Sequence, residues 1–344
     1  MGERPAAVRA MDPSSRGNQQ WRLSKRPVGM VRESDFALAT SPIPALEDGR
    51  LLVRNRVLAF EPAMRGWIDD RPSYLPPVPI GDVMRGMGAG EVIQSNLDGY
   101  APGDWVTGMF GWQQFAVADA GARKIPPGVE PKLALSVLGI TGITAYFGLL
   151  EIGRPQEGDT VVVSGAAGAT GSVVGQIAKR NGCRAVGIAG GAEKCAWLTH
   201  QAHFDAAIDY KREDVGARLD ALCPGGIDVF FDNVGGEILD EALAHIARGA
   251  RVVICGSISR YNAAEPQAGP RNYYQLVQKR ARMEGFVILD FLARSAEATA
   301  DLAGWVEDGS IAWEADVQQG FENAPKTLLR LYRGANFGKQ LLEI

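Results

Sequence analysis

The sequence predicts an α/β protein in which a compact β domain accompanies a doubly wound parallel sheet. Its 344 residues are enough for about two domains. From Trp21 to about Arg123, short apolar runs are broken by Gly and Pro, as in an irregular β domain. Beyond Pro131 the spacing becomes helical, and β-branched runs then alternate with helical segments. This alternation is typical of a parallel sheet with helices on both faces.

Composition and charge exclude several classes of protein. The chain has 36 basic and 40 acidic residues, a net charge of −4 and no long run of either sign, so we expect neither nucleic acid nor an anionic membrane as a partner. Its 4 cysteines and 3 histidines follow no disulfide or zinc spacing, and we expect no bound metal. Residues 1–15 read as a loose polar tail without the apolar core of a signal peptide, and no apolar run is long enough for a membrane span. We therefore expect a cytoplasmic protein.

The elements of the predicted sheet can be read in order. Three runs resemble buried parallel strands, namely TVVVSGAA, ARVVIC and DVFFDNV. Between and around them lie helical segments: KLALSVLGITGITAYFGLLEIG at residues 132–153, then GSVVGQIAKRNG, AEKCAWLTHQA and GEILDEALAHIARG. The terminal LYRGANFGKQLLEI reads as a β-like tail that returns to the β domain.

The strongest motif is a glycine-rich loop between a predicted strand over residues 160–164 and a helix that begins near Ser172. Glycines here let the backbone turn tightly and approach a pyrophosphate, which then meets the free N–H groups of the helix N-terminus. Ala167 takes the place of the middle glycine of G-x-G-x-x-G, but strand, loop, helix and second strand follow in the required order. The residues expected at the cofactor phosphates are Gly165, Gly168, Ala169, Thr170 and Gly171.

The end of the second strand, at residues 184–188, favours NADPH over NADH. Sites for NAD place an Asp or Glu here to bind the ribose hydroxyl. In this chain Gly190 and Gly191 occupy that position, and Lys194 follows within one helical turn. Small residues leave room for a 2′-phosphate, and lysine supplies a charge to hold it. The acidic Glu193 lies next to this lysine, so the charge at this position does not by itself distinguish NADPH from NADH.

Several further motifs occur in a fixed order along the chain. They are NQQWRLSKRPVGMV, EPAMRGW, PPVPIGDVMRGMGAGEV, GAAGATGSVVGQIAKRNGC, GIAGGAEKCAWL, FDAAIDYK, GIDVFFDNVGG and GANFGK. Together they resemble the zinc-independent medium-chain dehydrogenase/reductase superfamily. The match is nearest to the NADPH-dependent alkenal/one oxidoreductases, which include the prostaglandin reductases, plant double-bond reductases and bacterial curcumin reductase-like enzymes. The resemblance covers nearly the whole chain after about Asn18.

This resemblance implies an activity and a domain organisation. The family reduces the carbon–carbon double bond of α,β-unsaturated ketones and aldehydes, with hydride from NADPH to the β-carbon and a proton to the α-carbon, without a metal. A GroES-like substrate and catalytic domain is expected over residues 1–140 and 310–344, and a Rossmann NADPH-binding domain over 141–309. The active site is expected in the cleft between them. The resemblance also implies a small-molecule enone or enal substrate and a homodimer.

The resemblance also assigns roles to single residues. Tyr261 in ISRYN matches a tyrosine that assists proton delivery or holds the nicotinamide ribose, and we expect it to be the catalytic residue. A phenol with a pKa of about 10 can donate to an enolate at neutral pH; Tyr273 is a weaker candidate. Lys194 matches the lysine of the 2′-phosphate. The other positions expected to contact the cofactor are Thr144, Tyr210, Asn233, Cys255 and Asn336.

The chain departs from the family pattern at two positions. Ala63 replaces the aromatic residue of the DPYMR motif, and Thr141 replaces the proline of MPGLTAY. Both departures bear on the substrate pocket rather than on the cofactor. Two alternatives to enone reduction therefore stay open: an NADPH quinone reductase of the same superfamily, and a non-catalytic NADPH-binding regulatory protein.

Overall fold

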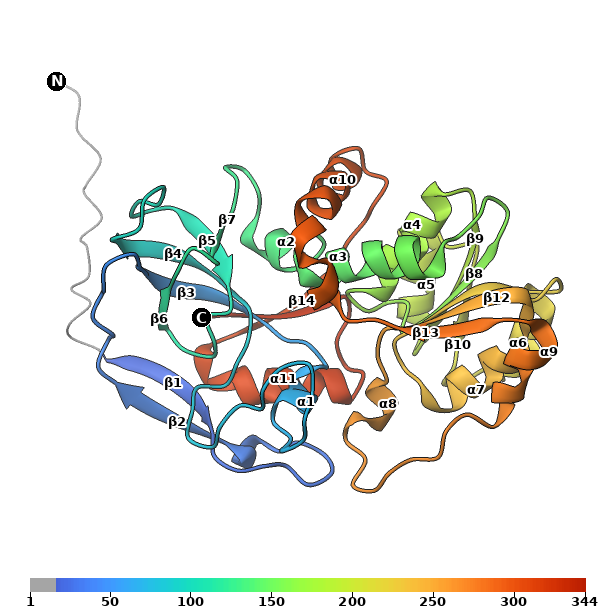
Figure 1. The fold of residues 1–344 in the computed structure, drawn as a ribbon, viewed down its shortest axis with the longest axis horizontal. Helices are drawn as coiled ribbons and strands as arrows, with labels where there is room; N and C mark the ends of the chain where they lie inside the picture. Colours follow the sequence, from blue (N-terminus) through green and yellow to red (C-terminus); the bar gives the residue numbers. More distant parts are fainter. Residues whose placement is uncertain (1–16) are drawn as a thin grey trace.

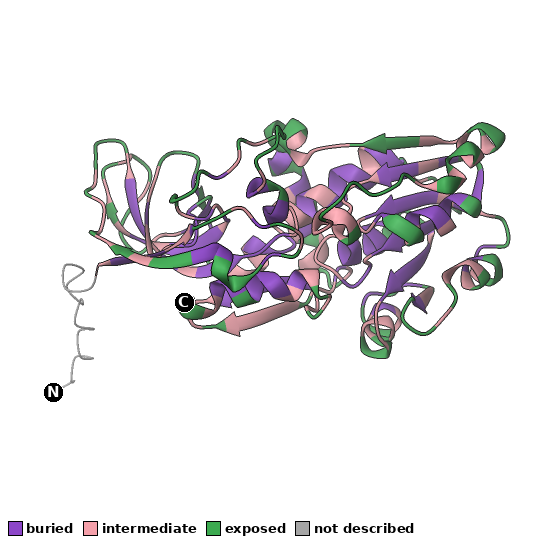
Figure 2. Cartoon of the chain, turned by 90° about the horizontal axis from the view of Figure 1, so that it is seen from below, coloured by how far each residue is buried: buried purple, intermediate pink, exposed green. Residues whose placement is uncertain are grey.

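The computed structural model describes residues 17–344 and confirms the predicted α/β class. The tail expected at residues 1–15 lies outside the described residues. Two large sheets lie one after the other along the long axis of the molecule (Figure 1). Buried residues concentrate in the strands of both sheets and in the helix faces turned toward them (Figure 2). The described part contains no helix long and apolar enough to cross a membrane.

The first sheet has six parallel strands in the order β10-β9-β8-β11-β12-β13. Val161, Val162 and Val163 of its inner strand β8 are fully buried, because the strand is covered on both faces. Val161 and Val163 pack into one core cluster and Val162 into another, as the two-residue repeat of a strand requires. The strands are β8 (Thr160–Ser164), β9 (Arg184–Ala189), β10 (Ala206–Asp209), β11 (Ile227–Asp232), β12 (Ile246–Ile254) and β13 (Arg282–Gly285).

Helices cover both faces of this sheet, so the predicted doubly wound arrangement is confirmed. Helix α4 (Gly171–Arg180), for example, buries Val173, Val174 and Ile177 at the three- and four-residue spacing of an amphipathic helix. The helices that accompany it are α3 (Ile140–Phe147), α5 (Ala192–His200), α6 (Val215–Leu222), α7 (Gly236–Ala244), α9 (Gln275–Lys279) and α10 (Ser295–Glu307).

The second sheet has seven strands, which come from residues 51–124 and 315–343. Its order is β14-β15-β3-β4-β5-β7, with β6 also paired to β3. The strands are β3 (Leu51–Ala59), β4 (Gly88–Ser95), β5 (Trp105–Gly108), β6 (Phe115–Ala118), β7 (Arg123–Lys124), β14 (Ala315–Gln319) and β15 (Lys339–Glu343). A separate antiparallel pair, β1 (Asn18–Leu23) and β2 (Phe36–Ser41), lies beside it. The domain boundaries at 140/141 and 309/310 stay a prediction.

The structure differs from the sequence-based expectation in three segments. The expected helical segment GEILDEALAHIARG is helical only to Ala244, and its residues 246–249 belong to strand β12. Residues 132–153 do not form one helix: α2 (Pro131–Leu135) ends before Gly139, α3 follows, and the six residues Gly148–Gly153 form a π-helix. A Cβ on Gly139 would lie 2.7 Å from the carbonyl oxygen of Ala134, because the backbone folds tightly between α2 and α3.

The C-terminal stretch also differs from the β-like tail that we expected. Helix α11 (Ala324–Tyr332) extends into it, and only Lys339–Glu343 form a strand. Leu328, Leu329 and Leu331 are buried, so this helix is held by its apolar face. The returning strand β15 then joins β3, as the expected return to the β domain requires.

Candidate cofactor cleft and active site

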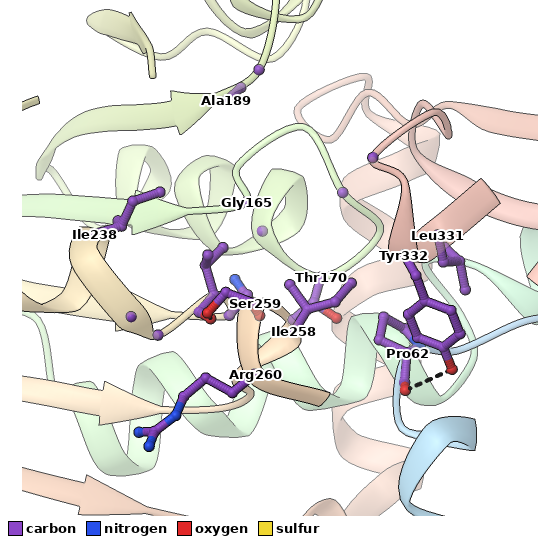
Figure 3. Close-up of a pocket in the computed structure, with 18 of the residues that line it drawn as sticks. Pro62, Gly165, Thr170, Ala189, Ile238, Ile258, Ser259, Arg260, Leu331 and Tyr332 are labelled. Atoms are coloured by element: carbon purple, nitrogen blue, oxygen red, sulfur yellow. Dashed lines mark hydrogen bonds between the residues drawn. The ribbon is translucent and has the colours of Figure 1, made fainter. Parts of the chain in front are cut away.

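A cleft of about 880 Å³ runs along the carboxyl ends of the parallel strands, where ligands of doubly wound sheets bind. Its volume is in the range of small-molecule and cofactor sites. Figure 3 shows Gly165, Thr170 and Ile258 on one side of it and Pro62 with Tyr332 on the other. The expected cofactor residues that line the cleft are Gly165, Gly168, Ala169, Thr170, Gly171, Gly190, Lys194, Tyr210, Asn233 and Asn336.

The glycine loop forms the floor of this cleft. Gly165 has φ +59°, a left-handed conformation that favours glycine, and its carbonyl oxygen accepts the N–H of Gly168 at 2.9 Å. A Cβ on Gly171 would lie 2.5 Å from that same carbonyl oxygen. The loop therefore turns directly into the N-terminus of α4, where free N–H groups and the helix dipole favour an anion. These residues fit the pyrophosphate of a dinucleotide.

The carboxyl end of β9 carries the second anion-binding feature. Lys194 lies in the first turn of α5, and its Nζ donates to the carbonyl oxygen of Gly334 at 3.0 Å, across the cleft. Burial lowers the pKa of Lys194, and the nearby charge of Lys211 lowers it further. A Cβ on Gly190 would lie 2.8 Å from the Tyr210 ring, so this glycine makes room for the tyrosine. An anion at this end would stabilise the charged form of the lysine.

The turn after β11 is held by a fully buried carboxylate. Asp232 accepts hydrogen bonds from the Ser164 hydroxyl at 2.7 Å and from the N–H groups of Val234 and Gly235 at 3.0 Å. Burial raises the pKa of Asp232, and these hydrogen bonds offset part of that effect. The Asn233 amide donates to the carbonyl oxygen of Ser164 at 2.8 Å. Asn233 is thus fixed on the cleft wall between β8 and β11.

Helix α8 (Ile258–Tyr261) closes the far end of the same wall. Ile258, Ser259 and Arg260 line the cleft (Figure 3). Tyr261 is half-buried and is not among the lining residues. The N–H of Ser257 donates to the Tyr261 hydroxyl oxygen at 3.1 Å. Burial raises the pKa of the Tyr261 phenol above its ordinary value. The hydroxyl is therefore a neutral donor, on the residue that directly follows the lining residue Arg260 in the chain.

Two other expected cofactor residues do not line the cleft. The Thr144 hydroxyl donates to the carbonyl oxygen of Ile140, one turn earlier in α3, at 2.6 Å. Cys255 follows β12, and burial raises the pKa of its thiol to about 12. Their roles, like that of Tyr261, stay predictions.

The opposite wall contains residues that the sequence reasoning did not single out. Glu61 and Lys339 form an ion pair with 2.7 Å between Oε1 and Nζ, and both line the cleft. The Tyr332 hydroxyl donates to the carbonyl oxygen of Pro62 at 3.3 Å (Figure 3). Thr141, one of the two departures from the family pattern, also lines the cleft. The motifs EPAMRGW and GANFGK contained Glu61 and Lys339, but only the pairing of β3 with β15 brings them together.

Acidic, cysteine and histidine side chains do not gather at this cleft in the way that a metal centre needs. Among residues 17–344, no group of three or more His, Cys, Asp or Glu could hold a metal ion. The residues that line the cleft include the glycine loop with its backbone N–H groups, the lysines Lys194 and Lys339, and the amides Asn233 and Asn336. This set suits the phosphates, ribose hydroxyls and carboxamide of a dinucleotide.

Two family models match most of the chain. Residues 19–125 match the N-terminal domain of oxidoreductase, and residues 169–304 match the family described as zinc-binding dehydrogenase. The chain is 40% identical over 342 residues to the NADPH-dependent curcumin reductase of Escherichia coli (strain K12), covering 97% of this chain and 99% of that protein. It is 35% identical over 335 residues to the NADP(+)-dependent 2-alkenal reductase of Nicotiana tabacum, covering 95% of this chain and 97% of the relative.

A solved structure agrees in fold and in sequence. The crystal structure of CurA in complex with NADPH, from Vibrio vulnificus, has a TM-score of 0.90 and 42% identity, and the match covers 94% of this chain and 98% of that one. The fold, the lining of the cleft and the sequence therefore all indicate the same family. The chain belongs to the zinc-independent branch of the medium-chain dehydrogenase/reductase superfamily and is an NADPH-dependent oxidoreductase.

Proposed function

We propose that this chain reduces the carbon–carbon double bond of α,β-unsaturated ketones and aldehydes. The observation that carries this proposal is one continuous cleft, which joins the glycine loop and Lys194 to α8, the helix that ends at Tyr261. The relative named 2-alkenal reductase supports the same substrate class. Reduction requires hydride at the β-carbon and a proton at the α-carbon, so the site needs both a hydride source and a proton donor.

The chain's own residues would bind and orient the cofactor. Lys194 and Tyr210 hold the 2′-phosphate, and the loop from Gly165 to Gly171 receives the pyrophosphate at the start of α4. Asn233, whose amide donates to the carbonyl oxygen of Ser164, lines the cleft and would contact the nicotinamide half. NADPH, when bound, supplies the hydride. With the strand order β9-β8-β11, the residues at the end of β9 would hold the adenosine end and those after β11 the nicotinamide half.

Tyr261 would act on the substrate after hydride addition. Negative charge then develops on the substrate's carbonyl oxygen, and a donor at this oxygen stabilises it. The raised pKa keeps the phenol protonated, and the bond from the Ser257 N–H leaves its O–H proton free to donate. The proton reaches the α-carbon from this hydroxyl or through a water molecule.

Turnover across a substrate panel tests the proposed function. NADPH oxidation is followed with alkenals, alkenones, phenolic enones and quinones. We expect kcat/KM for at least one enone class to exceed that for every quinone. Turnover confined to quinones would assign the quinone reductase activity instead. Tight NADPH binding without any turnover would assign a non-catalytic role.

The Lys194→Ala variant tests the 2′-phosphate site. Loss of a charge-assisted hydrogen bond should weaken NADPH binding by about 1–3 kcal/mol and leave NADH binding nearly unchanged. Both dissociation constants are measured by calorimetry. Lys326→Ala is the matched control, because Lys326 is exposed on α11 and does not line the cleft. Equal weakening of NADPH and NADH by Lys194→Ala would refute the phosphate role.

The Tyr261→Phe variant tests proton delivery. It should lower kcat by about 10²-fold, the scale of general acid catalysis, and leave the NADPH dissociation constant unchanged. Because the pKa of Tyr261 is raised, its phenol should stay protonated at every pH below about 10. The kcat of the wild type should therefore not fall in that range through deprotonation of Tyr261. Tyr273→Phe tests the weaker candidate in the same way and should leave kcat unchanged, since Tyr273 is 61% exposed. If Tyr261→Phe keeps the kcat of the wild type, the proton must come from water or from another residue.

We also propose that the chain forms a homodimer, as the resemblance implies. Strand β13 is the end strand of its sheet within one chain, and Met283 on it is 39% exposed. Tyr273, Tyr274 and Val277, which precede this strand, are more than half exposed. An unpaired edge with apolar neighbours is a surface that a second copy can extend. Sedimentation velocity measures the mass directly, and a monomer at micromolar concentration would contradict the proposal.

A further inference from the structure

Helix α8, which ends at Tyr261, is four residues long and contains no buried residue. Its first turn is fixed to the parallel-sheet side, because the N–H and the hydroxyl of Ser259 donate to the carbonyl oxygen of Val234 at 3.1 and 2.6 Å. The bond from the Ser257 N–H to the Tyr261 hydroxyl lies within the same short segment. A single helical turn without core packing is marginal by itself. The place of Tyr261 therefore depends on what holds the C-terminal end of α8.

That end is held by a contact with the loop between β1 and β2. Asn262 directly follows α8, and its Oδ1 accepts the N–H of Val31 at 3.3 Å. A Cβ on Gly29 would lie 3.8 Å from the carbonyl oxygen of Asn262 and 3.9 Å from the Cβ of Ala264, which is van der Waals contact. The two loops thus lie side by side, although 231 positions separate Val31 from Asn262 (Figure 1).

The N–H of Val31 has no other acceptor. Val31 is 1% exposed and belongs to the same core cluster as Phe60 and Leu342 of the second sheet. Among residues 17–344, Asn262 provides the one acceptor for its N–H. A buried N–H without an acceptor is costly, so the contact between the two loops is favoured. The hydrogen bond therefore ties the end of α8 to the core of the second sheet.

A buried arginine fixes the other side of this contact. Arg65 is 4% exposed and forms an ion pair with Asp69. Its Nη2 also lies 3.4 Å from the carbonyl oxygens of Pro27 and Gly29, to which it donates. Gly29 has φ +68°, a left-handed conformation that favours glycine. The motifs NQQWRLSKRPVGMV and EPAMRGW thus meet in one loop, and this loop presents the Val31 N–H to Asn262.

We propose that Asn262 is a positioning residue for Tyr261: by accepting the Val31 N–H, it holds the end of α8 where the Tyr261 hydroxyl can reach the substrate. This inference rests on the proposed role of Tyr261 in proton delivery. Asn262 does not line the cleft, so it acts through its neighbour and not on the substrate. Without the hydrogen bond, α8 keeps its attachment at Ser259, but its last residue spends less time in the reactive position. The cofactor residues from Gly165 to Gly171 are unaffected.

The Asn262→Ala substitution in two backgrounds tests this proposal. Turnover is measured with NADPH and the panel substrate that has the highest kcat/KM. In otherwise wild-type protein, kcat should fall about tenfold, the effect of one lost hydrogen bond, and the dissociation constant of NADP⁺ should stay within about twofold. In the Tyr261→Phe background the substitution should have no further effect, because the group that it positions is absent. An equal fall of kcat in both backgrounds would overturn the proposal, since it marks a structural role.

Two further variants complete the kinetic test. Asn262→Asp keeps an oxygen that can accept the Val31 N–H, so it should retain at least about half of the wild-type kcat. Asn96→Ala is the matched control, because Asn96 donates to the carbonyl oxygen of Glu47 at 3.3 Å, is exposed and lies outside the cleft. It should leave kcat unchanged. The proposal is wrong if Asn262→Ala keeps the wild-type kcat, or if Asn262→Asp is as slow as Asn262→Ala.

Hydrogen exchange tests the contact itself without a substrate. Each protein is saturated with NADP⁺, and exchange is followed by mass spectrometry in peptides that cover residues 27–33 and 256–264. Asn262→Ala should exchange at least about tenfold faster than wild type in both peptides, whereas Asn262→Asp and Asn96→Ala should match wild type. Wild-type exchange in both peptides of Asn262→Ala would overturn the proposal. A failed substrate panel would refute the proposed function, but these exchange rates would still test whether Asn262 holds the two loops together.

Discussion

The close turn between β8 and α4 is the constraint on which the rest of the cleft depends. Because Gly171 lies against the carbonyl oxygen of Gly165, a side chain at position 171 would collide with the backbone of the loop itself. The loop also receives a contact from the other sheet, since Gly338 donates to Ala167. A Cβ on Gly338 would lie 2.0 Å from the carbonyl oxygen of Glu314, so a side chain there would displace the backbone that makes this contact. The two glycines therefore preserve the close turn of the loop and its contact with the opposite wall.

The two walls of the cleft contribute different chemistry. The parallel-sheet side provides free N–H groups at α4, a lysine at α5 and amide groups after β11. The opposite side provides a carboxylate, a second lysine and the Tyr332 hydroxyl, from residues 60–62 and 331–340. Lys194 reaches across to Gly334, so cofactor recognition and the contact between the walls share one side chain. An anion at Lys194 would compete with the carbonyl oxygen of Gly334 for the lysine ammonium group. Cofactor binding would therefore be coupled to the packing of residues 333–338.

Features that depend on neighbouring residues could be predicted from the sequence. The apolar run at β8, the glycine loop and Lys194 all lie within two consecutive strand–loop–helix units, where spacing determines geometry. Features that depend on long-range pairing could not. Glu61 and Lys339 are 278 positions apart, and only the β3–β15 register makes them neighbours. Thr144 shows a second limit of prediction from sequence. The spacing of apolar residues identifies a helix, but it does not show to which acceptor a hydroxyl on that helix donates. The residue roles, the homodimer and the cytoplasmic location stay predictions.

The fate of the transferred hydrogen tests the central claim most directly. Wild-type protein is supplied with NADPH that carries deuterium at the transferable position of the nicotinamide, together with an enone that is turned over, and the product is analysed by NMR. The account predicts deuterium at the former β-carbon, with the new hydrogen at the α-carbon taken from water. Deuterium at the carbonyl carbon, in an allylic alcohol with its double bond intact, would contradict the account.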